Sequence, residues 1–313
     1  MPPAHVVAVV VNWNTADLLD ACLASLAADI PTGIAERVVV VDNGSVDGSV
    51  ELVRRGWPGV ELIANERNEG YTRANNQALR SGDGDHDYVL LINADAQLTP
   101  GCLAGLLARM GADPRAAVVA PRLVYGDGTW QRWTAGRAPD LGSVAAFYLF
   151  LEKLPGRWRR RSLFLADDVA DAFQPDWVSS ACMLVRRAAL DQIGLMDETY
   201  FCYMDDVELC QRARDGGWHV WYEPAAQAVH LMGQSTRRQT GRASPAALRN
   251  FNHYVQSRHG RLAAAGVRAA EFAGFATRAA LYAASSPVGG PAARQQARSH
   301  LQNLRTTLVR GKV

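Results

Sequence analysis

Short runs of consecutive apolar residues alternate with helix-like segments through the first 120 residues of this chain. The apolar runs are residues 6–11, 38–41, 60–63, 89–92 and 117–120, and the first two consist almost entirely of valine. Runs without polar alternation are typical of strands buried on both faces, and strands separated by helices form parallel sheets. The pattern predicts an α/β fold with a mostly parallel sheet that carries helices on both faces.

The segments between these strands have helical periodicity, and they are predicted as helices at residues 16–28, 48–55, 72–80 and 100–110. Asp47 and Thr99 precede two of these helices and are residue types preferred at helix N-caps. Pro100 would then occupy the first helical position, where its missing N–H costs nothing. Farther along the chain, residues 182–185 and 218–222 are predicted as strands, and residues 187–194 and 205–215 as helices.

Composition excludes several classes of protein. The chain has 313 residues, of which 48% are apolar and 20% charged, so it can enclose a core and is not a disordered chain. Its five Cys are scattered without a CxxC pair, which excludes a disulfide framework or a zinc ribbon and favours a reducing compartment. No N-terminal signal peptide is visible, and no apolar stretch approaches the roughly 18 residues of a membrane span. The sequence therefore predicts a cytoplasmic globular protein.

The charge is unevenly distributed. The whole chain has a formal net charge of +2, but residues 237–313 hold 12 Arg and Lys312 against Glu271 alone, a net charge of +12. The remaining 236 residues therefore carry −10. Beyond residue 245 the sequence is rich in Ala and Arg and predicts three helical segments, broken near Gly260 and near residues 285–287. A basic helical region on an acidic body is typical of a segment that meets an anionic partner.

Polar residues follow each of the first four predicted strands. They are Asn12 and Asn14, then Asp42, Asn43 and Ser45, then Asn65 and Asn68, and finally Asn93 and Asp95. In an open parallel sheet these carboxyl ends share one edge, where ligands bind. Turn formation explains any one of these positions equally well. Together, the four positions favour a polar edge suited to a nucleotide.

The sequence lacks a glycine-rich phosphate loop. Neither G-x-G-x-x-G nor G-x-x-x-x-G-K-[ST] follows the first predicted strand. A diphosphate bound here would need another cation, most simply a metal ion held by carboxylates. Asp95 is the best candidate ligand, and hard oxygen ligands suit Mg²⁺ or Mn²⁺.

Seven motifs, in order and at compatible spacings, carry a resemblance to a known family. They are VVNWNT (Val10–Thr15), VDNGSVDGS (Val41–Ser49), NEGYTRANNQAL (Asn68–Leu79), LLINADAQLTP (Leu90–Pro100), SSACMLVRRAAL (Ser179–Leu190), GLMDETYFCYMDDVELCQRAR (Gly194–Arg214) and GWHVWYEPAAQAVHLMGQS (Gly217–Ser235). With these motifs the chain resembles the family 2 glycosyltransferases, and within them bacterial rhamnosyltransferase-type enzymes, over roughly residues 6–235. The resemblance implies a GT-A fold, a nucleotide-diphospho-sugar donor, Mg²⁺ or Mn²⁺, and inversion at the anomeric carbon.

The resemblance implies a division into domains. Residues 1–236 would form the GT-A catalytic domain, with a nucleotide-binding half at 1–120 and an acceptor and catalytic half at 121–236. Residues 237–313 would form a basic helical C-terminal region outside the strongest resemblance.

The resemblance also assigns the donor site by position. Asp42 would accept a hydrogen bond from the nucleotide base, and Asn14 and Ser45 would lie near the base and the ribose. Asn68 and Arg73 fall in a segment associated with donor binding. Asn93-Ala94-Asp95 stands in place of the family's DxD motif, so Asp95 would make most of the metal contact. His230 matches a downstream histidine associated with the metal or the diphosphate.

Asp205 and Asp206 occupy the family's ED position, whose acidic residue is the usual base. This chain has Asp for Glu at the first place, which leaves open which of the two acts, and we favour Asp206. Such a carboxylate would remove the proton of an acceptor hydroxyl, while the cation absorbs charge on the leaving phosphate. The alternative is that the pair only caps the helix that follows.

The leading hypothesis is an inverting, metal-dependent transferase that moves a sugar such as rhamnose to a hydroxyl of a glycan or polyprenyl-linked acceptor. The alternatives are transfer of another sugar, such as galactofuranose or N-acetylhexosamine, and a sugar-nucleotide-binding scaffold without turnover. Trp130 and Trp133 are candidates for stacking on an acceptor sugar or for ordinary packing.

The basic region has several interpretations. Arg268 and Arg278 lie close in the sequence to four apolar residues: Phe272, Phe275, Leu281 and Tyr282. This combination predicts an amphipathic surface that binds an anionic membrane. The Arg157–Arg161 cluster would add positive charge to the same surface. The enzyme would then lie at the inner face of the plasma membrane. A homo-oligomer interface and simple neutralisation of the acidic body are the alternatives. No nucleic-acid-binding motif is present, so we expect no nucleic-acid partner.

Overall fold

The computed structural model describes residues 4–30, 34–82, 84, 86–154, 156, 158, 161–165, 167–231 and 245–308. The chain divides into two compact units. The sheet unit consists of Met1–Ala135 and Asp167–Gln239, and the helical unit consists of Gly136–Ala166 and Thr240–Val313. The predicted domain boundary at residues 236 and 237 lies outside the described residues, as do Arg157, Arg159 and Arg160.

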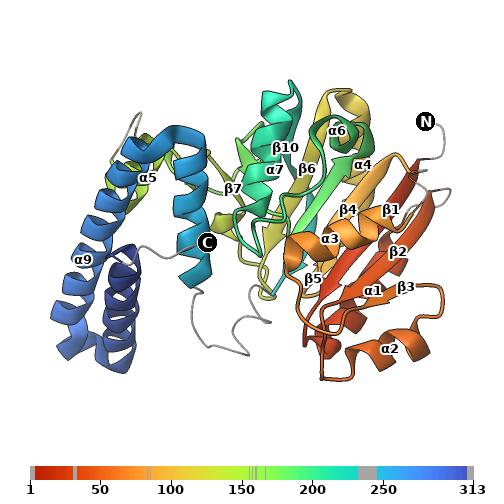
Figure 1. Ribbon diagram of the computed structural model, residues 1–313, viewed down its shortest axis with the longest axis horizontal. Coiled ribbons are helices and arrows are strands. Elements are labelled where there is room, and N and C mark those ends of the chain that lie inside the picture. The colour runs from red at the N-terminus through yellow and green to blue at the C-terminus, as the bar shows by residue number, and fades with distance from the viewer. Residues whose placement is uncertain are drawn as a thin grey trace. The chain divides into compact units, whose positions relative to one another are not determined.

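An eight-stranded sheet forms the centre of the sheet unit, in the order β3-β2-β1-β4-β9-β6-β10-β5 (Figure 1). Its strands are β1 (His5–Asn12), β2 (Ala35–Asp42), β3 (Glu61–Ala64), β4 (Tyr88–Asn93), β5 (Ala96–Leu98), β6 (Ala116–Val124), β9 (Cys182–Arg186) and β10 (His219–His230). Only β9 and β5 run antiparallel to their neighbours, so the expected mostly parallel sheet is confirmed. The short strands β7 (Ala135–Gly136) and β8 (Trp177–Val178) form a separate pair.

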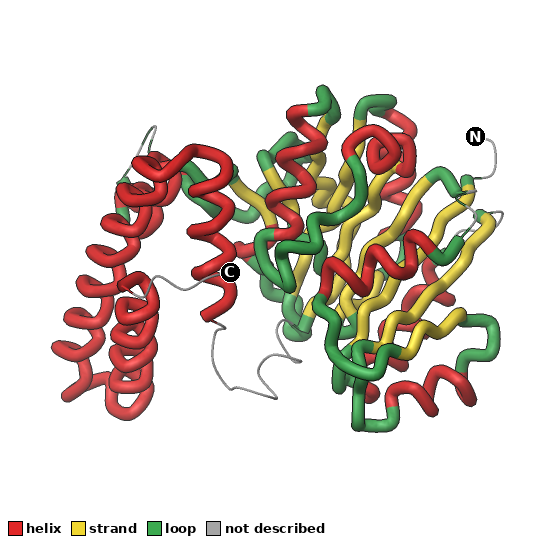
Figure 2. The backbone as a smooth tube through the Cα atoms, in the orientation of Figure 1, coloured by secondary structure: helices red, strands yellow, loops and turns green. Residues whose placement is uncertain are grey.

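Helices cover both faces of this sheet, as Figure 2 shows. They are α1 (Ala16–Asp29), α2 (Ser49–Gly56), α3 (Tyr71–Arg80), α4 (Cys102–Ala112), α6 (Arg187–Ile193) and α7 (Asp205–Asp215), with a 3₁₀ turn at Arg132–Thr134.

Strand β1 is buried on both of its faces. Val6, Ala8 and Val10 join one core with apolar residues of α1, α2 and α4. Val7 and Val9, which point to the opposite face, are buried as well. Burial on both faces explains why this strand has no polar alternation.

The register of the parallel strands brings their polar ends together. Asn12 at the end of β1 lies opposite Asp42 at the end of β2, and Val11 lies opposite Asn93 at the end of β4. Asp42 in turn lies opposite Ala64, one residue before Asn65. The predicted shared edge of polar strand ends is therefore confirmed.

The two predicted helix caps were wrong by one or two residues. The N-caps of α2 and α4 are Gly48 and Gly101, both in the left-handed backbone conformation. Asp47 instead accepts a hydrogen bond from the Ser49 N–H, at 3.1 Å. The hydroxyl of Thr99 donates to the carbonyl of Gln227, so a contact with a distant strand replaces the capping bond expected from local sequence.

The helical unit contains α5 (Leu141–Tyr148), a 3₁₀ turn at Leu151–Lys153, and α9 (Pro245–Leu308). The backbone of α9 is non-helical at Gly260 and Gly290, so the break expected near Gly260 is confirmed and the second break lies beyond residues 285–287. Helix α5 packs on α9 through the rings of Tyr148 and Phe275, whose centroids are 5.1 Å apart. Among the residues that the structure describes, no helix is both long and apolar enough to cross a membrane.

Candidate active site

The polar ends of β1 and β2 form a tightly bonded cluster. The amide of Asn12 donates to the Asp42 carboxylate at 2.7 Å, and the Ser45 N–H donates to the other Asp42 oxygen at 2.8 Å. The Ser45 hydroxyl accepts a hydrogen bond from the Asn14 N–H at 2.8 Å. Three of the predicted donor-site residues, Asn14, Asp42 and Ser45, are thus brought together, and Asn12 joins them.

Asn14 has a positive φ of 55°, a conformation that Asn tolerates better than most residues. Its side-chain oxygen accepts a hydrogen bond from the Val46 N–H at 2.8 Å, which ties the loop after β1 to the loop after β2. Asp42 is almost fully buried, with both carboxylate oxygens bonded to protein groups. These hydrogen bonds therefore hold the loops after β1 and β2 together at the edge of the sheet.

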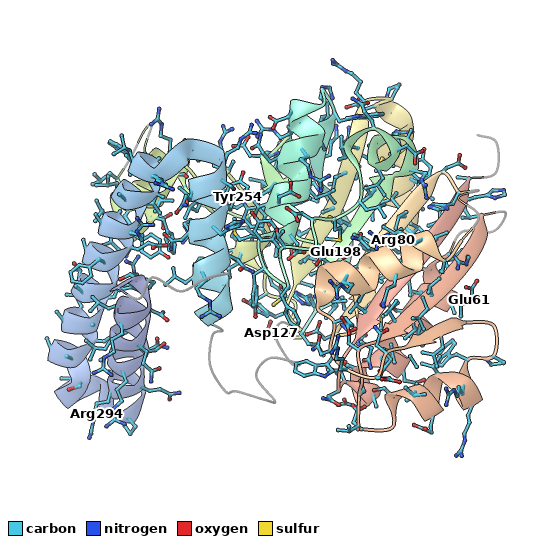
Figure 3. The ribbon with its side chains drawn as sticks, viewed as in Figure 1. Glu61, Arg80, Asp127, Glu198, Tyr254 and Arg294 are labelled. Carbon is cyan, nitrogen blue, oxygen red and sulfur yellow. The ribbon has the colours of Figure 1, made fainter. Side chains whose placement is uncertain are left out.

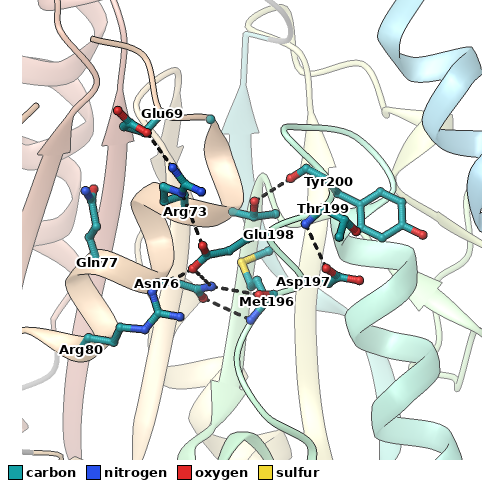
Figure 4. A network of polar contacts seen from close by, with 12 residues as sticks. Glu69, Arg73, Asn76, Gln77, Arg80, Met196, Asp197, Glu198, Thr199 and Tyr200 are labelled. Carbon is teal, nitrogen blue, oxygen red and sulfur yellow. Dashed lines mark hydrogen bonds and ion pairs between the residues drawn. The ribbon is translucent and has the colours of Figure 1, made fainter. Parts of the chain in front are cut away.

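Asn68 and Arg73 were also predicted at the donor site; Asn68 precedes α3, and Arg73 lies in its first turn. The Asn68 side chain accepts a hydrogen bond from the Gly70 N–H and so shapes the turn that begins the helix. Arg73 lies between two carboxylates, at 2.9 Å from Glu69 and 3.4 Å from Glu198, as Figure 4 shows. These two carboxylates raise the pKa of the half-exposed guanidinium.

Helix α3 holds the segment that leads into α7. The Tyr71 N–H donates to the Phe201 carbonyl at 2.7 Å, and the Thr72 hydroxyl donates to the Tyr200 carbonyl at 2.6 Å. The buried Asn76 side chain bonds the backbone of Met196 through both its amide nitrogen and its oxygen. The NEGYTRANNQAL motif therefore supports the segment that precedes Asp205, a role that its sequence did not reveal.

Asp205 and Asp206 are the first two residues of α7, and the N-cap is Met204. The Ser180 hydroxyl donates to Asp205 at 3.2 Å, and the Ser180 N–H donates to Asp206 at 3.4 Å. Asp205 is buried, whereas Asp206 is partly buried. Neither residue occupies the N-cap, but the Asp206 carboxylate accepts a hydrogen bond from the Val207 N–H in the first turn of α7, at 2.8 Å.

Burial raises the pKa of both carboxyl groups, and the neighbouring charge of Asp206 raises the pKa of Asp205 further. Tyr71 is also close, because its hydroxyl donates to the Ser180 carbonyl at 2.9 Å. Its pKa is raised by burial and by the charge of Asp205. A carboxylate with a raised pKa is a better proton acceptor, as a general base requires.

The backbone before this pair is strained. Tyr203 and Met204 both have positive φ, at 66° and 70°, which is uncommon for residues other than Gly, Asn and Asp. Such strain persists only where the surrounding structure holds it, and it is concentrated at functional sites. Tyr71, Ser180 and the strained turn were missed in the sequence, because no local pattern marks them.

Asp95 and His230 lie next to each other at the edge of the sheet, although they are 135 residues apart in the sequence. The imidazole Nε2 of His230 is 3.4 Å from a carboxylate oxygen of Asp95, and both side chains are buried. Strand β5 pairs with the end of β10, placing Ala96 opposite His230. The two predicted metal ligands are thus brought together.

Backbone hydrogen bonds connect the chain beside this pair to the chain beside the Asp205–Asp206 cluster. The Asn93 N–H, two residues before Asp95, donates to the Ala181 carbonyl at 3.0 Å. Ala181 follows Ser180, which holds both aspartates. The two residues that precede the antiparallel strand β9 therefore link the two groups of carboxylates. The sequence did not predict that β9 is antiparallel.

The Asp95–His230 pair fits a divalent cation in part. Adjacent ligands of an octahedral ion bound at about 2.1 Å are roughly 3 Å apart, close to the spacing of this pair. Within the described ranges, no group of three or more His, Cys, Asp or Glu side chains could hold a metal ion. Two protein ligands plus substrate phosphates is a usual arrangement for Mg²⁺. The pair could therefore hold a cation together with a diphosphate.

Comparisons with known proteins bear on this site. The sequence profile described as Glycosyl transferase family 2 matches residues 7–194. The N-acetylglucosaminyl-diphospho-decaprenol L-rhamnosyltransferase of Mycobacterium tuberculosis is 31% identical over 264 residues, which cover 80% of this chain and 84% of that protein.

Two solved structures are similar in fold. A crystal structure of GalNAc-T7 with UDP, GalNAc and Mn²⁺ matches with a TM-score of 0.58 and 16% identity, over 81% of this chain and 48% of that one. The mannosyltransferase PcManGT from Pyrobaculum calidifontis, in complex with GDP-Man and Mn²⁺, matches with a TM-score of 0.54 and 17% identity, over 98% of this chain and 86% of that one. The expected GT-A fold is confirmed, with a helical C-terminal extension.

Proposed function

Because the chain belongs to glycosyltransferase family 2 and is similar to its rhamnosyltransferases, we propose that it transfers rhamnose, with inversion, from a nucleotide-diphospho-sugar to a hydroxyl of a polyprenyl-linked glycan. The observation that carries this proposal is the presence of two polar groups that are connected through the hydrogen bonds of Ser180 and Ala181. Asp205 and Asp206 supply a base, and Asp95 and His230 supply a cation site. Inversion requires a base and a leaving group on opposite sides of the anomeric carbon.

Asp206 is the proposed base. It is the more exposed member of the pair, and its carboxylate is held by the N–H groups of Ser180 and Val207. An acceptor hydroxyl bound beside it would lose its proton to the carboxylate as the new C–O bond forms. General-base catalysis of this kind contributes typically 10²–10⁴-fold to the rate.

Asp205 would modulate its neighbour. Its burial and the closeness of Asp206 favour the protonated form of Asp205 at neutral pH. A neutral Asp205 leaves Asp206 as the carboxylate that accepts the proton, because two adjacent carboxylates removed from water resist ionising together.

Asp95 and His230 are the proposed ligands of Mg²⁺ or Mn²⁺. A divalent cation bound there would stabilise the negative charge that develops on the departing diphosphate. The Asn14, Asp42 and Ser45 cluster would receive the base and ribose of the donor, with Asn68, Arg73 and Asn93 at its margins. Both solved structures above contain Mn²⁺ and a nucleotide, which supports this assignment.

The helical unit would dock on an anionic membrane, where a polyprenyl-linked acceptor resides. Its two segments contain 17 Lys and Arg against three acidic residues, a net charge of +14. Exposed apolar side chains accompany this charge: Leu141, Leu149, Leu154, Leu262, Phe272, Leu281, Tyr282, Val288 and Leu301. Arg294 projects from α9, as Figure 3 shows. Basic and apolar residues together favour the interface of an anionic bilayer, here the inner face of the plasma membrane.

Two residues expected on this surface have other contacts. Phe275 is buried against Tyr148, and the Arg278 guanidinium donates to the Tyr148 carbonyl at 2.8 Å. They stabilise the packing of α5 on α9. Phe272, Leu281 and Tyr282 are exposed.

A transfer assay tests the proposal. Purified protein is incubated with Mn²⁺, a panel of nucleotide-sugars that includes the rhamnosyl donor, and a synthetic polyprenyl-diphosphate-linked N-acetylglucosamine. We expect release of nucleoside diphosphate and a product of inverted configuration only with the rhamnosyl donor. Transfer from a galactofuranosyl or N-acetylhexosaminyl donor would identify a transferase of another sugar. Donor binding without release from any donor would identify a scaffold and contradict the proposal.

A further inference from the structure

The buried side chain of Gln131 contacts His230 on the side away from Asp95. Its amide nitrogen donates to the carbonyl of His230 and, at 3.2 Å, to the carbonyl of Val124. Its amide oxygen is 3.1 Å from the imidazole Nδ1 of His230. Gln131 itself is fully buried.

These contacts decide the orientation of the Gln131 amide. Backbone carbonyls only accept hydrogen bonds, so the amide group facing two of them must be the NH₂ group. The oxygen must then face the imidazole. Because an amide oxygen only accepts, Nδ1 of His230 must carry the proton and donate it.

The position of that proton determines what Nε2 presents to Asp95. In a neutral imidazole with its proton on Nδ1, Nε2 has an unprotonated lone pair. This lone pair and the Asp95 carboxylate are 3.4 Å apart, and both are electron-rich. Such a pair is suited to share a cation. A proton on Nε2 would instead make His230 a hydrogen-bond donor to Asp95 and block its lone pair.

We infer that Gln131 is a positioning residue, which fixes the Nδ1-protonated tautomer of His230 and so presents Nε2 as a ligand for a divalent cation beside Asp95. This inference rests on the cation site of the proposed function. Groups that hold the second nitrogen of a ligating histidine typically change metal affinity by 10- to 100-fold when they are removed.

Gln131 also belongs to a turn that contacts the other half of the site. The Thr134 hydroxyl donates to the Gln131 carbonyl at 2.9 Å, and the Thr134 carbonyl accepts from the Ser179 N–H at 2.8 Å. Ser179 precedes Ser180, which holds Asp205 and Asp206. The turn at Arg132–Thr134 therefore connects Gln131, which contacts His230, to Ser179, which precedes Ser180.

Two substitutions separate the acceptor role of Gln131 from its structural role. Gln131→Met and Gln131→Glu both remove the NH₂ group that bonds two carbonyls. Only Gln131→Met also removes the oxygen that accepts the Nδ1 proton, since a carboxyl group keeps such an oxygen. A purely structural role would be lost in both variants, whereas the positioning role would be lost in Gln131→Met alone.

The imidazole ¹⁵N NMR spectrum of the full-length protein provides the readout. The chain has seven His, so His230→Gln assigns the signal. We expect the Nδ1-protonated tautomer in the wild type and in Gln131→Glu, and the Nε2-protonated tautomer in Gln131→Met. Titration with Mn²⁺ alone should broaden the His230 signal, at a concentration about 10- to 100-fold higher in Gln131→Met than in the wild type.

Gln192→Met is the matched control, because Gln192 bonds Gly216 and Trp218 away from the site. It should leave the tautomer and the Mn²⁺ titration unchanged. An unchanged tautomer in Gln131→Met, or equal losses in Gln131→Met and Gln131→Glu, would overturn the inference. If Mn²⁺ fails to broaden His230 in the wild type, the cation site of the proposed function is refuted, while the tautomer still reports on Gln131.

Discussion

The backbone N–H of Tyr71 donates a hydrogen bond to the carbonyl of Phe201, at 2.7 Å. This bond joins the first residue of α3 to the segment that leads into Asp205 and Asp206. Gly70, the residue before Tyr71, lies so close to Phe201 that a Cβ atom at position 70 would be 2.7 Å from the Phe201 ring. The position of the proposed base therefore depends on a glycine in a distant motif.

Gly70→Ala should displace the segment before Asp205. The φ of +91° at Gly70 disfavours Ala, and the added methyl group would collide with both the ring and the carbonyl of Phe201. A displacement of about 1 Å at a catalytic group can cost roughly 10²-fold in rate, so we expect such a loss in kcat with donor affinity retained. Steady-state kinetics and donor calorimetry measure the two effects.

Gly101→Ala is the control for this change. Gly101 also has a positive φ, of +82°, but no atom lies within 4 Å of an added Cβ. It should lower stability by about 1–2 kcal/mol without changing kcat. Equal kinetics in the two variants would contradict the steric role of Gly70.

Asp206→Asn should reduce transfer by about 10²–10⁴-fold while donor binding is retained, because an amide cannot accept the hydroxyl proton. Turnover and donor calorimetry test this expectation. Asp215→Asn, at the other end of α7, is the control and should retain activity. A fully active Asp206→Asn enzyme would assign the base to Asp205 instead.

The pH–rate profile should reflect the raised pKa of the aspartate pair. Burial raises the pKa of Asp206, and Asp206 must be ionised to act as a base. Protonation at low pH should therefore abolish activity, and kcat/KM should rise with pH through an apparent pKa above the ordinary value of about 3.9 for Asp. Because the two carboxyl groups interact, this pKa belongs to the pair. An ascending limb at or below the ordinary value would exclude the pair as the base.

Asp95→Ala and His230→Ala should each weaken Mn²⁺ binding and donor binding together. The His230 Nε2 and an Asp95 carboxylate oxygen are 3.4 Å apart, and each side chain would supply one protein ligand. Calorimetry with Mn²⁺ and the donor measures both affinities. His219→Ala is the control, since that imidazole pairs with Asp113 at 2.6 Å. Metal-independent activity of Asp95→Ala would refute the cation site.

Substitution of Arg261, Arg294 and Arg298 by Gln should weaken binding to anionic vesicles. All three side chains are exposed on α9, and each basic residue near such a surface contributes about 1 kcal/mol, so we expect roughly a 10²-fold loss. Vesicle sedimentation at low and high salt measures it. The same change at Arg54, Arg55 and Arg115 in the sheet unit is the control. Equal losses in the two triple variants would refute a membrane surface on α9 and leave the oligomer or packing interpretations.

The sequence by itself determined the parallel half of the sheet and the edge where ligands bind. Continuous valine runs such as that of β1 are stable only when both faces are covered, so local composition was sufficient. The polar strand ends followed from the same argument, because parallel strands end at one edge. The family resemblance added Asp205, Asp206, Asp95 and His230 as candidates.

Only the tertiary structure decided which of these side chains meet. Three contacts join residues that are distant in the sequence, and no local pattern encodes them. They are the Asp95–His230 pair, the hydrogen bond of Ser180 to Asp206, and the contact of Gln131 with His230. The antiparallel strand β9 and the packing of residues 136–166 with the C-terminal helix are likewise set by long-range burial. Local propensity acts over a few residues, whereas hydrogen bonds between distant strands form only once the chain has folded, and the proposed chemistry depends on those bonds.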